Sequence, residues 1–217
     1  MSKNVSLPVV RRLPRYYRFL RELMENGVIR ISSGDLSRRM GLTASQIRQD
    51  LNCFGGFGQQ GYGYNVRALY EEIGRIMGLG KHREAILVGA GNLGRAVSRH
   101  MDFASRGFAL TGVFDVNPEL VGRQIGEVVI QDIRQLEAFC APNPPAVAIL
   151  CIPKEAAPAI VKRLVALGVR GFWNFSHYDI ALHYPEVVAE NVHLGDSLST
   201  LCYRINELEK QPAQPEE

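Results

Sequence analysis

Apolar positions recur with two different spacings along this chain, and the spacing changes near residue 80. Before that point, apolar residues return every three or four positions, as on one side of a helix. After it, short apolar runs of strand length alternate with helical stretches. Because such alternation is typical of a parallel sheet covered by helices, we expect a mainly helical domain over 1–80 and an α/β domain over 85–195. A terminal helix over 196–209 and a disordered polar tail over 210–217 follow.

Up to Phe54 the pattern predicts three helices. The first carries Pro14 in its first turn and ends at Gly27. Its apolar side is made by Leu13, Tyr16, Tyr17, Leu20 and Met24, and its basic edge by Arg15, Arg18 and Arg21. The second, through Met40, follows serines that can cap it. The third, Ala44 to Phe54, opens with Thr43 and Gln46 in the Thr-x-x-Gln form of a capping box.

The third predicted helix separates into an apolar side and a polar stripe. The apolar side holds Ala44, Ile47, Leu51 and Phe54, and the stripe holds Ser45, Arg48, Gln49 and Asn52. Arginine can donate two hydrogen bonds to guanine, and glutamine or asparagine can pair with adenine, so the stripe suits readout of the DNA major groove. An ordinary solvated helix face has the same pattern, and the stripe alone does not separate the two.

A glycine-rich segment follows at 55–64, with Phe57, Tyr62 and Tyr64 among five glycines. Interleaved aromatic residues favour a packed hairpin, or wing, over a flexible linker. A further helix from Val66 to about Leu79 completes the domain. The sequence therefore predicts a winged helix-turn-helix domain at 1–80.

The α/β domain opens with an apolar strand, Ala85 to Val88, that runs into a glycine turn and a helix. The turn is Gly89-Ala90-Gly91-Asn92-Leu93-Gly94. In a dinucleotide-binding unit the first glycine makes the tight turn, the second lets the backbone approach a pyrophosphate, and the third lets the helix pack on the strand. The helix N-terminus offers N–H groups to the phosphates. A bare strand–helix turn, a CoA site and an FAD site are the alternatives.

A second apolar strand, Leu110 to Phe114, ends at Asp115. A carboxylate here accepts hydrogen bonds from a ribose 2′-hydroxyl and repels a 2′-phosphate, so the spacing predicts NAD(H) rather than NADP(H). The competing interpretation makes Asp115 a strand-end cap.

The α/β alternation continues from there. We expect strands at 127–130, 147–152, 171–175 and 192–195, helices at 132–139 and after Pro153, and an irregular segment at 177–185. Ligands bind at the carboxyl ends of such strands, so Pro153 is a candidate for the nicotinamide half of the site. The terminal helix buries an apolar stripe either on its own sheet or on a second subunit. That stripe comprises Leu198, Leu201, Cys202, Ile205 and Leu208.

Charge and composition narrow the class of protein. Residues 1–80 hold 12 Lys and Arg against 6 Asp and Glu, whereas the remainder holds 13 against 16, so the basic half is the one with the candidate DNA-reading helix. No apolar run reaches the roughly 20 residues that span a bilayer. The N-terminus lacks the apolar core of a signal peptide, and we expect a cytoplasmic protein. The four cysteines show no C-x-x-C spacing, so neither a metal site nor a disulfide is predicted.

These motifs together resemble those of the bacterial redox-sensing transcriptional repressor family, Rex. The likeness is carried by Arg12-Leu13-Pro14-Arg15-Tyr16-Tyr17-Arg18, Ile47-Arg48-Gln49-Asp50-Leu51, Gly61-Tyr62-Gly63-Tyr64, Val88-Gly89-Ala90-Gly91-Asn92-Leu93-Gly94, Phe114-Asp115, Ile152-Pro153, Leu167-Gly168-Val169 and Asn174-Phe175. It implies a homodimer that binds a palindromic DNA operator when NAD⁺ predominates and leaves it when NADH rises. It also implies that the C-terminal helix is swapped between subunits.

Several positions depart from the pattern of the family that this chain resembles. Gln49 follows the recognition-helix arginine, and Gln59 and Gln60 stand in the wing, where the family usually has basic residues. His100 stands where a tyrosine near the nicotinamide is common. His193 stands where an aspartate commonly pairs with an N-terminal arginine of the other subunit, which by this resemblance would be Arg12.

Two sets of site residues follow from the motifs and the resemblance. The set for NAD(H) is Gly89, Ala90, Gly91, Asn92, Leu93, Gly94, Asp115, Val116, Ile152, Pro153, His100 and Phe175. The set for DNA is Arg12, Arg15, Ser45, Gln46, Arg48, Gln49, Asn52, Gln59, Gln60 and Tyr62.

Two other functions compete with a regulator. An NAD-dependent dehydrogenase with a basic helical appendage would need a proton-transfer residue, for which His100, His177 and His193 are candidates, and a substrate domain for which little chain is left. A CoA-binding module would leave the recognition helix without a role. We therefore expect a transcriptional repressor and not an enzyme.

Overall fold

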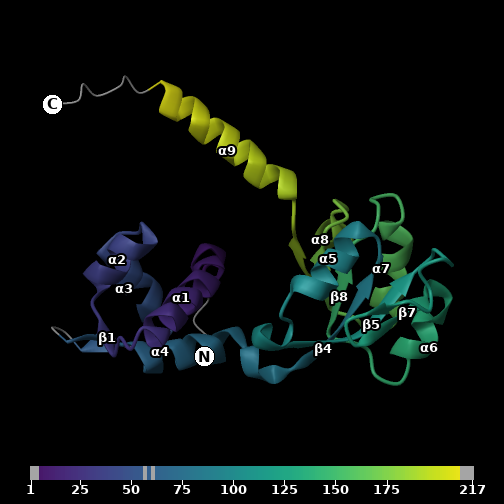
Figure 1. Ribbon diagram of the computed structural model, residues 1–217, viewed down its shortest axis with the longest axis horizontal. Coiled ribbons are helices and arrows are strands. Elements are labelled where there is room, and N and C mark those ends of the chain that lie inside the picture. Colours follow the sequence, from purple (N-terminus) through teal and green to yellow (C-terminus); the bar gives the residue numbers. More distant parts are fainter. Residues whose placement is uncertain (1–4, 56–57, 60–61, 211–217) are drawn as a thin grey trace. The chain divides into compact units, whose positions relative to one another are not determined.

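The computed structural model describes residues 5–55, 58–59 and 62–210, and the chain divides between Lys81 and His82 into two compact units (Figure 1). The predictions for Gln60 and for the tail beyond Lys210 lie outside the described residues.

The first unit is a winged helix-turn-helix domain. Its helices are α1 (Leu7–Glu25), α2 (Ser33–Met40), α3 (Ala44–Asn52) and α4 (Val66–Met77), followed by a 3₁₀ turn at η1 (Leu79–Lys81). Its strands are β1 (Arg30–Ile31), β2 (Gly58–Gln59) and β3 (Gly63–Asn65). They form one antiparallel sheet in the order β1-β3-β2, so the hairpin β2–β3 is the predicted wing.

The prediction that Pro14 lies in the first turn of α1 is wrong. The helix begins at Leu7, and Pro8 takes the first-turn position, where its missing N–H is no loss. Val9 is buried one helical repeat before Leu13, so the apolar stripe starts earlier than we predicted. Pro14 itself lies on the exposed side, where water can reach the carbonyl group that a proline leaves without an N–H partner.

Side-chain caps fix the start of both helices of the helix-turn-helix. The Ser32 hydroxyl accepts a hydrogen bond from the Asp35 N–H at 3.0 Å, and the Thr43 hydroxyl accepts one from the Gln46 N–H at 3.1 Å. Between them Gly41 adopts a left-handed φ of +61° and ends α2. The third helix ends at Asn52, two residues earlier than we predicted.

The second unit is built on a seven-stranded sheet in the order β10-β9-β8-β4-β5-β7-β6, parallel except for β6. Its strands are β4 (Arg83–Val88), β5 (Phe108–Asp115), β6 (Gln124–Ile125), β7 (Val128–Asp132), β8 (Val147–Leu150), β9 (Gly171–Asn174) and β10 (Val188–Asn191). Its helices are α5 (Asn92–His100), α6 (Leu136–Cys140), α7 (Ala157–Ala166), α8 (Ile180–His183) and α9 (Leu194–Glu209), with 3₁₀ turns η2 (Ala104–Arg106) and η3 (Ile133–Gln135). This is the Rossmann-type architecture that the sequence predicts.

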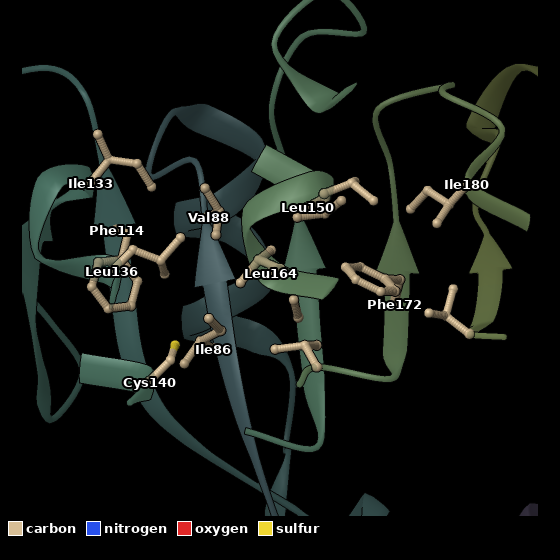
Figure 2. Packing of buried hydrophobic residues seen from close by; sticks show 14 residues of the cluster. Ile86, Val88, Phe114, Ile133, Leu136, Cys140, Leu150, Leu164, Phe172 and Ile180 are labelled. Carbon is tan, nitrogen blue, oxygen red and sulfur yellow. The ribbon is translucent and has the colours of Figure 1, made fainter. Parts of the chain in front are cut away.

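Helices cover both faces of this sheet. On one face, α6 and α7 pack on alternate residues of the central strands, and Phe114, Leu136 and Leu164 are fully buried there (Figure 2). On the other face a smaller cluster includes Leu87 and Ile149, with Val97 of α5 packed against it. The doubly covered strands explain why their sequences read as continuous apolar runs.

Two predictions near the C-terminus are wrong. The segment predicted to be irregular at 177–185 contains the short helix α8, which Asp179 caps. The last strand is β10 at Val188–Asn191 and not at 192–195. Most of its side chains are exposed because it lies at the edge of the sheet, so it lacks the apolar alternation that marks a strand in a sequence.

The terminal helix α9 begins at Leu194, three residues earlier than we predicted, and buries none of its residues. Its apolar stripe is exposed, at 68% for Leu198, 51% for Leu201, 46% for Ile205 and 68% for Leu208, and Cys202 is also exposed. Among the described residues of a single chain the stripe therefore does not dock on its own sheet, and of the two predicted destinations a second subunit stays a prediction.

Candidate DNA interface and nucleotide site

The polar stripe of α3 faces solvent in full. Ser45, Gln46, Arg48, Gln49 and Asn52 are all exposed. Ile47 and Leu51, on the opposite side of the helix, are 0% and 1% exposed, so the domain core fixes which side points outward. The arrangement gives α3 a continuous outer row of side chains that can donate and accept hydrogen bonds with base edges.

Arg48 is the one cation in this row, and its side chain contacts α2. The Arg48 Nη1 donates a hydrogen bond to the Ser33 hydroxyl at 3.1 Å. Because Ser33 is the first residue of α2, this contact joins the two helices of the helix-turn-helix on their exposed side.

The wing holds a second group of predicted DNA residues. Tyr62 is 69% exposed, and Arg30 of β1 lies against it: the guanidinium sits 5.9 Å from the ring centroid, and Nη1 donates to the Tyr62 carbonyl oxygen at 3.3 Å. Gln59 lies in β2, paired with Gly63 of β3. Arg15 of α1 is exposed, with its guanidinium 5.9 Å from the Phe19 ring.

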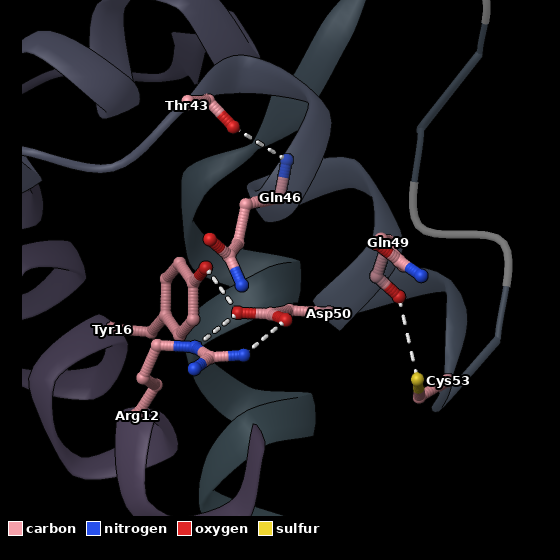
Figure 3. A network of polar contacts seen from close by, with 7 residues as sticks. All are labelled: Arg12, Tyr16, Thr43, Gln46, Gln49, Asp50 and Cys53. Atoms are coloured by element: carbon pink, nitrogen blue, oxygen red, sulfur yellow. Dashed lines mark hydrogen bonds and ion pairs between the residues drawn. The ribbon is translucent and has the colours of Figure 1, made fainter. Parts of the chain in front are cut away.

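Arg12 is engaged inside its own domain. Its Nε and Nη2 donate to the two carboxylate oxygens of Asp50 at 2.7 Å each, and the Tyr16 hydroxyl donates to Asp50 Oδ2 at 2.9 Å (Figure 3). The hydrogen bond to Asp50 raises the pKa of Arg12, and burial together with the same carboxylate raises the pKa of Tyr16. We expected the Arg12 guanidinium to contact DNA or the residue at position 193 of the other subunit. In the structure it is instead bound to Asp50 of its own domain.

We missed Asp50 in the sequence, although a signal was present. It lies three residues after Ile47 and one before Leu51, and so on the apolar side of α3. A carboxylate in that position is expensive to bury without a cation and hydrogen bonds, so its presence predicts a basic partner on a neighbouring element.

In the second unit, strand register brings the predicted nucleotide residues to one edge of the sheet. Val88 pairs with Phe114 on one side and with Leu150 on the other, and Leu150 pairs with Asn174. The residues that follow these four positions therefore emerge together at the carboxyl ends of parallel strands. They are Gly89 to Gly94, Asp115 and Val116, Ile152 and Pro153, and Phe175.

The three glycines of the turn have different surroundings. Gly89 has a φ of +98°, and a Cβ there would lie 2.4 Å from the Cys151 carbonyl oxygen. A Cβ on Gly94 would lie 1.8 Å from the Gly89 carbonyl oxygen, so only glycine lets α5 pack this closely. A Cβ on Gly91 would meet no atom within 4 Å. The space in front of Gly91 is therefore open to a ligand, as the fit of a pyrophosphate requires.

Asp115 closes the turn from the neighbouring strand. Its Oδ2 accepts a hydrogen bond from the Ala90 N–H at 2.5 Å, and its Oδ1 accepts one from the Asn117 N–H at 2.8 Å. The residue is 9% exposed. The strand-end cap that we considered as an alternative is therefore present, and each carboxylate oxygen retains a further lone pair for a hydroxyl donor.

The structure brings together most of the remaining predicted residues, but not His100. Phe175 packs edge-to-face on Trp173 with ring centroids 4.8 Å apart, and Pro153, which follows β8, is exposed. His100 is the last residue of α5, about 12 Å along the helix axis from the glycine turn at its start. Within one chain His100 is thus remote from the turn.

Asn174 organises the loop behind this edge. Its side-chain amide donates to the Tyr178 carbonyl and to Asn191 Oδ1 at 2.7 and 2.9 Å, and its carbonyl oxygen accepts from Ser176. The fully buried amide thereby ties the ends of β9 and β10 together. The sequence motif marked Asn174 as part of the resemblance but not this role.

One apolar cavity lies away from this edge. A hollow of about 340 Å³ lies toward the opposite ends of the strands, where Met101, Phe103, Phe108 and Trp173 line it. None of the residues that we predicted for the nucleotide lines it. Among the described residues, no group of three or more His, Cys, Asp and Glu side chains is placed to hold a metal ion. No described helix is both long and apolar enough to cross a bilayer.

Comparison with known proteins agrees with this two-part organisation. Residues 4–52 match the family model "Putative DNA-binding protein N-terminus", and residues 80–178 match "CoA binding domain". The redox-sensing transcriptional repressor Rex of Caldanaerobacter subterraneus subsp. tengcongensis is 54% identical over 96% of this chain and 94% of its own length. Rex of Caldicellulosiruptor saccharolyticus is 50% identical over 98% and 97%.

Solved structures of RSP are similar to this protein over nearly the whole chain. The crystal structure of RSP in complex with β-NAD⁺ and operator DNA is 52% identical and covers 95% of each chain, with a TM-score of 0.88. The structure of RSP in complex with β-NADH is 49% identical, covers 95% of this chain and 97% of that chain, and has a TM-score of 0.87.

A winged helix joined to a Rossmann domain of this kind defines a DNA-binding transcription regulator with a nucleotide-binding sensor domain. The protein belongs to the Rex family of redox-sensing transcriptional repressors, so the resemblance seen in its motifs is confirmed.

Proposed function

We propose that this protein represses transcription by binding a palindromic operator with NAD⁺ or without ligand, and that NADH binding releases it. The observation that carries the proposal is the combination, on one chain, of an exposed row of base-reading side chains on α3 with a glycine turn closed by Asp115. Support also comes from RSP, a Rex-family repressor solved both with β-NAD⁺ and operator DNA and with β-NADH.

In the first unit, α3 lies in the major groove. Arg48, Gln49 and Asn52 face the base edges, where each good bidentate pair discriminates by about 1–3 kcal/mol. Arg15 and the wing residues Tyr62 and Gln59 contact the backbone or the neighbouring groove, and the same role is proposed for Gln60. Because Gln49 and the wing glutamines carry no charge, they add nothing to the salt dependence of binding.

In the second unit, the backbone around Gly91 and the N-terminus of α5 bind the pyrophosphate. Asp115 accepts the ribose 2′-hydroxyl and selects NAD(H) over NADP(H). Pro153, Ile152 and Phe175 contact the nicotinamide, whose charge and ring planarity distinguish the oxidised from the reduced cofactor. A coupling of about 1–3 kcal/mol between cofactor and operator, or roughly 5–150-fold in affinity, is typical of such regulation.

The working form that we propose is a homodimer. Two recognition helices presented one DNA turn apart match a palindrome only at one angle, so a change of that angle releases the operator. The exposed apolar stripe of α9 supports a dimer, because a second subunit supplies the cover that the chain itself lacks. This is the swapped helix that the resemblance implies.

We propose no catalytic role for this protein. The relatives are named as repressors, and we propose that this protein acts on bacterial DNA in the cytoplasm. His100 and His177 are exposed, and His177 Nδ1 lies 3.1 Å from Nδ1 of the half-buried His193; we propose no proton-transfer role for these three residues.

Two titrations and a turnover assay separate these functions. Fluorescence anisotropy of labelled operator is followed while NAD⁺, NADH or CoA is added to the purified protein, and NADH affinity is measured without DNA by fluorescence. We expect NADH alone to release DNA, Arg48→Ala to abolish operator binding with unchanged NADH affinity, and CoA to have no effect. Equal operator affinity at every NADH/NAD⁺ ratio would show that the two units are not coupled, and turnover of NADH with a carbonyl substrate would favour a dehydrogenase.

A further inference from the structure

Asp50 is a buried carboxylate on the helix that is proposed to read DNA. Its side chain is 3% exposed and accepts three hydrogen bonds, all from α1. The donors are Arg12 and Tyr16, which are four residues apart and therefore adjacent on one side of that helix. Figure 3 shows both side chains converging on Asp50 from the same direction.

A pair of this kind fixes orientation in a way that apolar contacts do not. Two parallel N–H···O bonds between a planar guanidinium and a planar carboxylate define both the distance and the direction of approach. The apolar contacts of Ile47 and Leu51 hold α3 on the domain without specifying its rotation so narrowly, because apolar attraction is not directional. Asp50 is immediately adjacent to Gln49 in the sequence, so the rotation that it sets decides where the exposed row points.

We propose that Arg12 is a positioning residue, which with Tyr16 fixes the rotation of α3 through Asp50, and not a contact to DNA. This inference rests on the proposed function and replaces the sequence-based assignment of Arg12 to the DNA phosphates or to a partner subunit. Two of its donor nitrogens are bound to the carboxylate, and the Asp50 charge compensates its own. A compensated cation contributes little to the counterion release on which phosphate binding depends.

The conservative substitution Arg12→Lys separates the two roles. Lysine binds phosphate as a point charge but has no fork to match a carboxylate. If Arg12 positions α3, Arg12→Lys lowers affinity for the operator by about tenfold while affinity for a random duplex stays within about twofold. The slope of log affinity against log salt concentration is then unchanged.

Two further variants complete the experiment. Asp50→Asn removes the carboxylate without touching any exposed residue, and we expect the same selective loss of operator affinity. The double variant Arg12→Gln with Asp50→Asn leaves no buried charge unpaired, so it keeps a folded domain even where a single change does not. We expect its loss to be no greater than that of the worse single variant, because both changes break one network.

The outcomes that contradict the inference are distinct. If Arg12→Lys keeps full operator affinity, while Arg12→Gln lowers the salt slope by about 0.9, as we expect for the exposed Arg15→Gln, then Arg12 binds phosphate. Failure of the wild-type protein to respond to NADH would count against the proposed function and leave this test intact, because the comparison of operator with random duplex needs no cofactor.

Discussion

The Asp115 carboxylate performs one task for the protein and, in the proposed complex, a second for the cofactor. It holds the Ala90 and Asn117 N–H groups, which keeps the glycine turn closed against the end of β5. The two interpretations of this residue, as cap and as ribose ligand, therefore do not exclude each other. The hydrogen bonds from the Ala90 and Asn117 N–H groups fix the orientation of the Asp115 carboxylate before any ligand binds.

Replacing Asp115 tests both tasks. We expect Asp115→Ala to weaken NADH binding by roughly 10–150-fold, since a hydrogen bond to a charged group contributes about 1.5–3 kcal/mol. Operator binding without cofactor should be unchanged. Asp115→Asn is the matched control, because it keeps an acceptor for the turn but loses the charge that repels a 2′-phosphate. Its affinity for NADPH should therefore rise relative to its affinity for NADH. Calorimetric titration with each cofactor measures this, and unaltered NADH affinity in Asp115→Ala would exclude the ribose role.

Residues that belong to a fixed spacing motif were predictable, and a residue whose role depends on one distant partner outside any motif was not. Gly89, Gly94 and Asp115 follow from a spacing that local strand and helix geometry imposes. The partner of Asp50 is Arg12, 38 residues away, and only the packing of α1 on α3 brings them together. His100 was assigned to the nicotinamide from the resemblance alone, and its position at the end of α5 places it away from the glycine turn within one chain.

At the level of elements, the start of α5 is defined by how closely it approaches β4. The Gly94 Cα lies against the Gly89 carbonyl, and a methyl group there has no room. Edge elements behave differently: β10 was misplaced by the sequence pattern because a mostly solvent-exposed strand at the sheet edge loses its apolar signature. Element boundaries inside the core were therefore predicted well, and those at its margins were not.

Alanine substitutions at Gly94 and Gly91 should affect different properties, the first the stability of the second unit and the second its NADH affinity. Gly94→Ala forces α5 away from β4, and we expect it to destabilise the second unit by about 3 kcal/mol or more, as overpacking at a buried site does. Gly91→Ala meets open space at a φ of −66°, so the melting temperature should hold while NADH binding falls about tenfold or more. Differential scanning calorimetry and NADH titration separate the two. Normal NADH affinity in Gly91→Ala would show that the pyrophosphate does not bind next to Gly91.

At the scale of the whole molecule, α9 is a helix whose apolar side is not packed against any described part of its own chain. Its apolar stripe remains exposed in a single chain, although the stripe has the spacing of a buried helix face. The sequence left two destinations open, and the structure excludes the chain's own sheet among its described residues. A second subunit remains as the proposed cover.

A charge placed in that stripe should separate the subunits. We expect Leu201→Glu to produce monomers and to lower operator affinity by at least about a hundredfold, because two half-sites no longer bind together. Thr200→Glu adds the same charge outside the stripe and should stay dimeric. Analytical ultracentrifugation reads the mass, and NADH titration shows whether each sensor unit remains folded. A dimeric Leu201→Glu protein would place the interface elsewhere.

The two borders of the seven-stranded sheet also limit how copies of this protein can associate. One border is β6, two residues long and antiparallel to its neighbour, and the other is β10, which carries Glu190 and Asn191. Short or polar border strands give an incoming strand little to pair with, which protects against edge-to-edge aggregation. Growth of the sheet from one molecule into the next is thereby disfavoured.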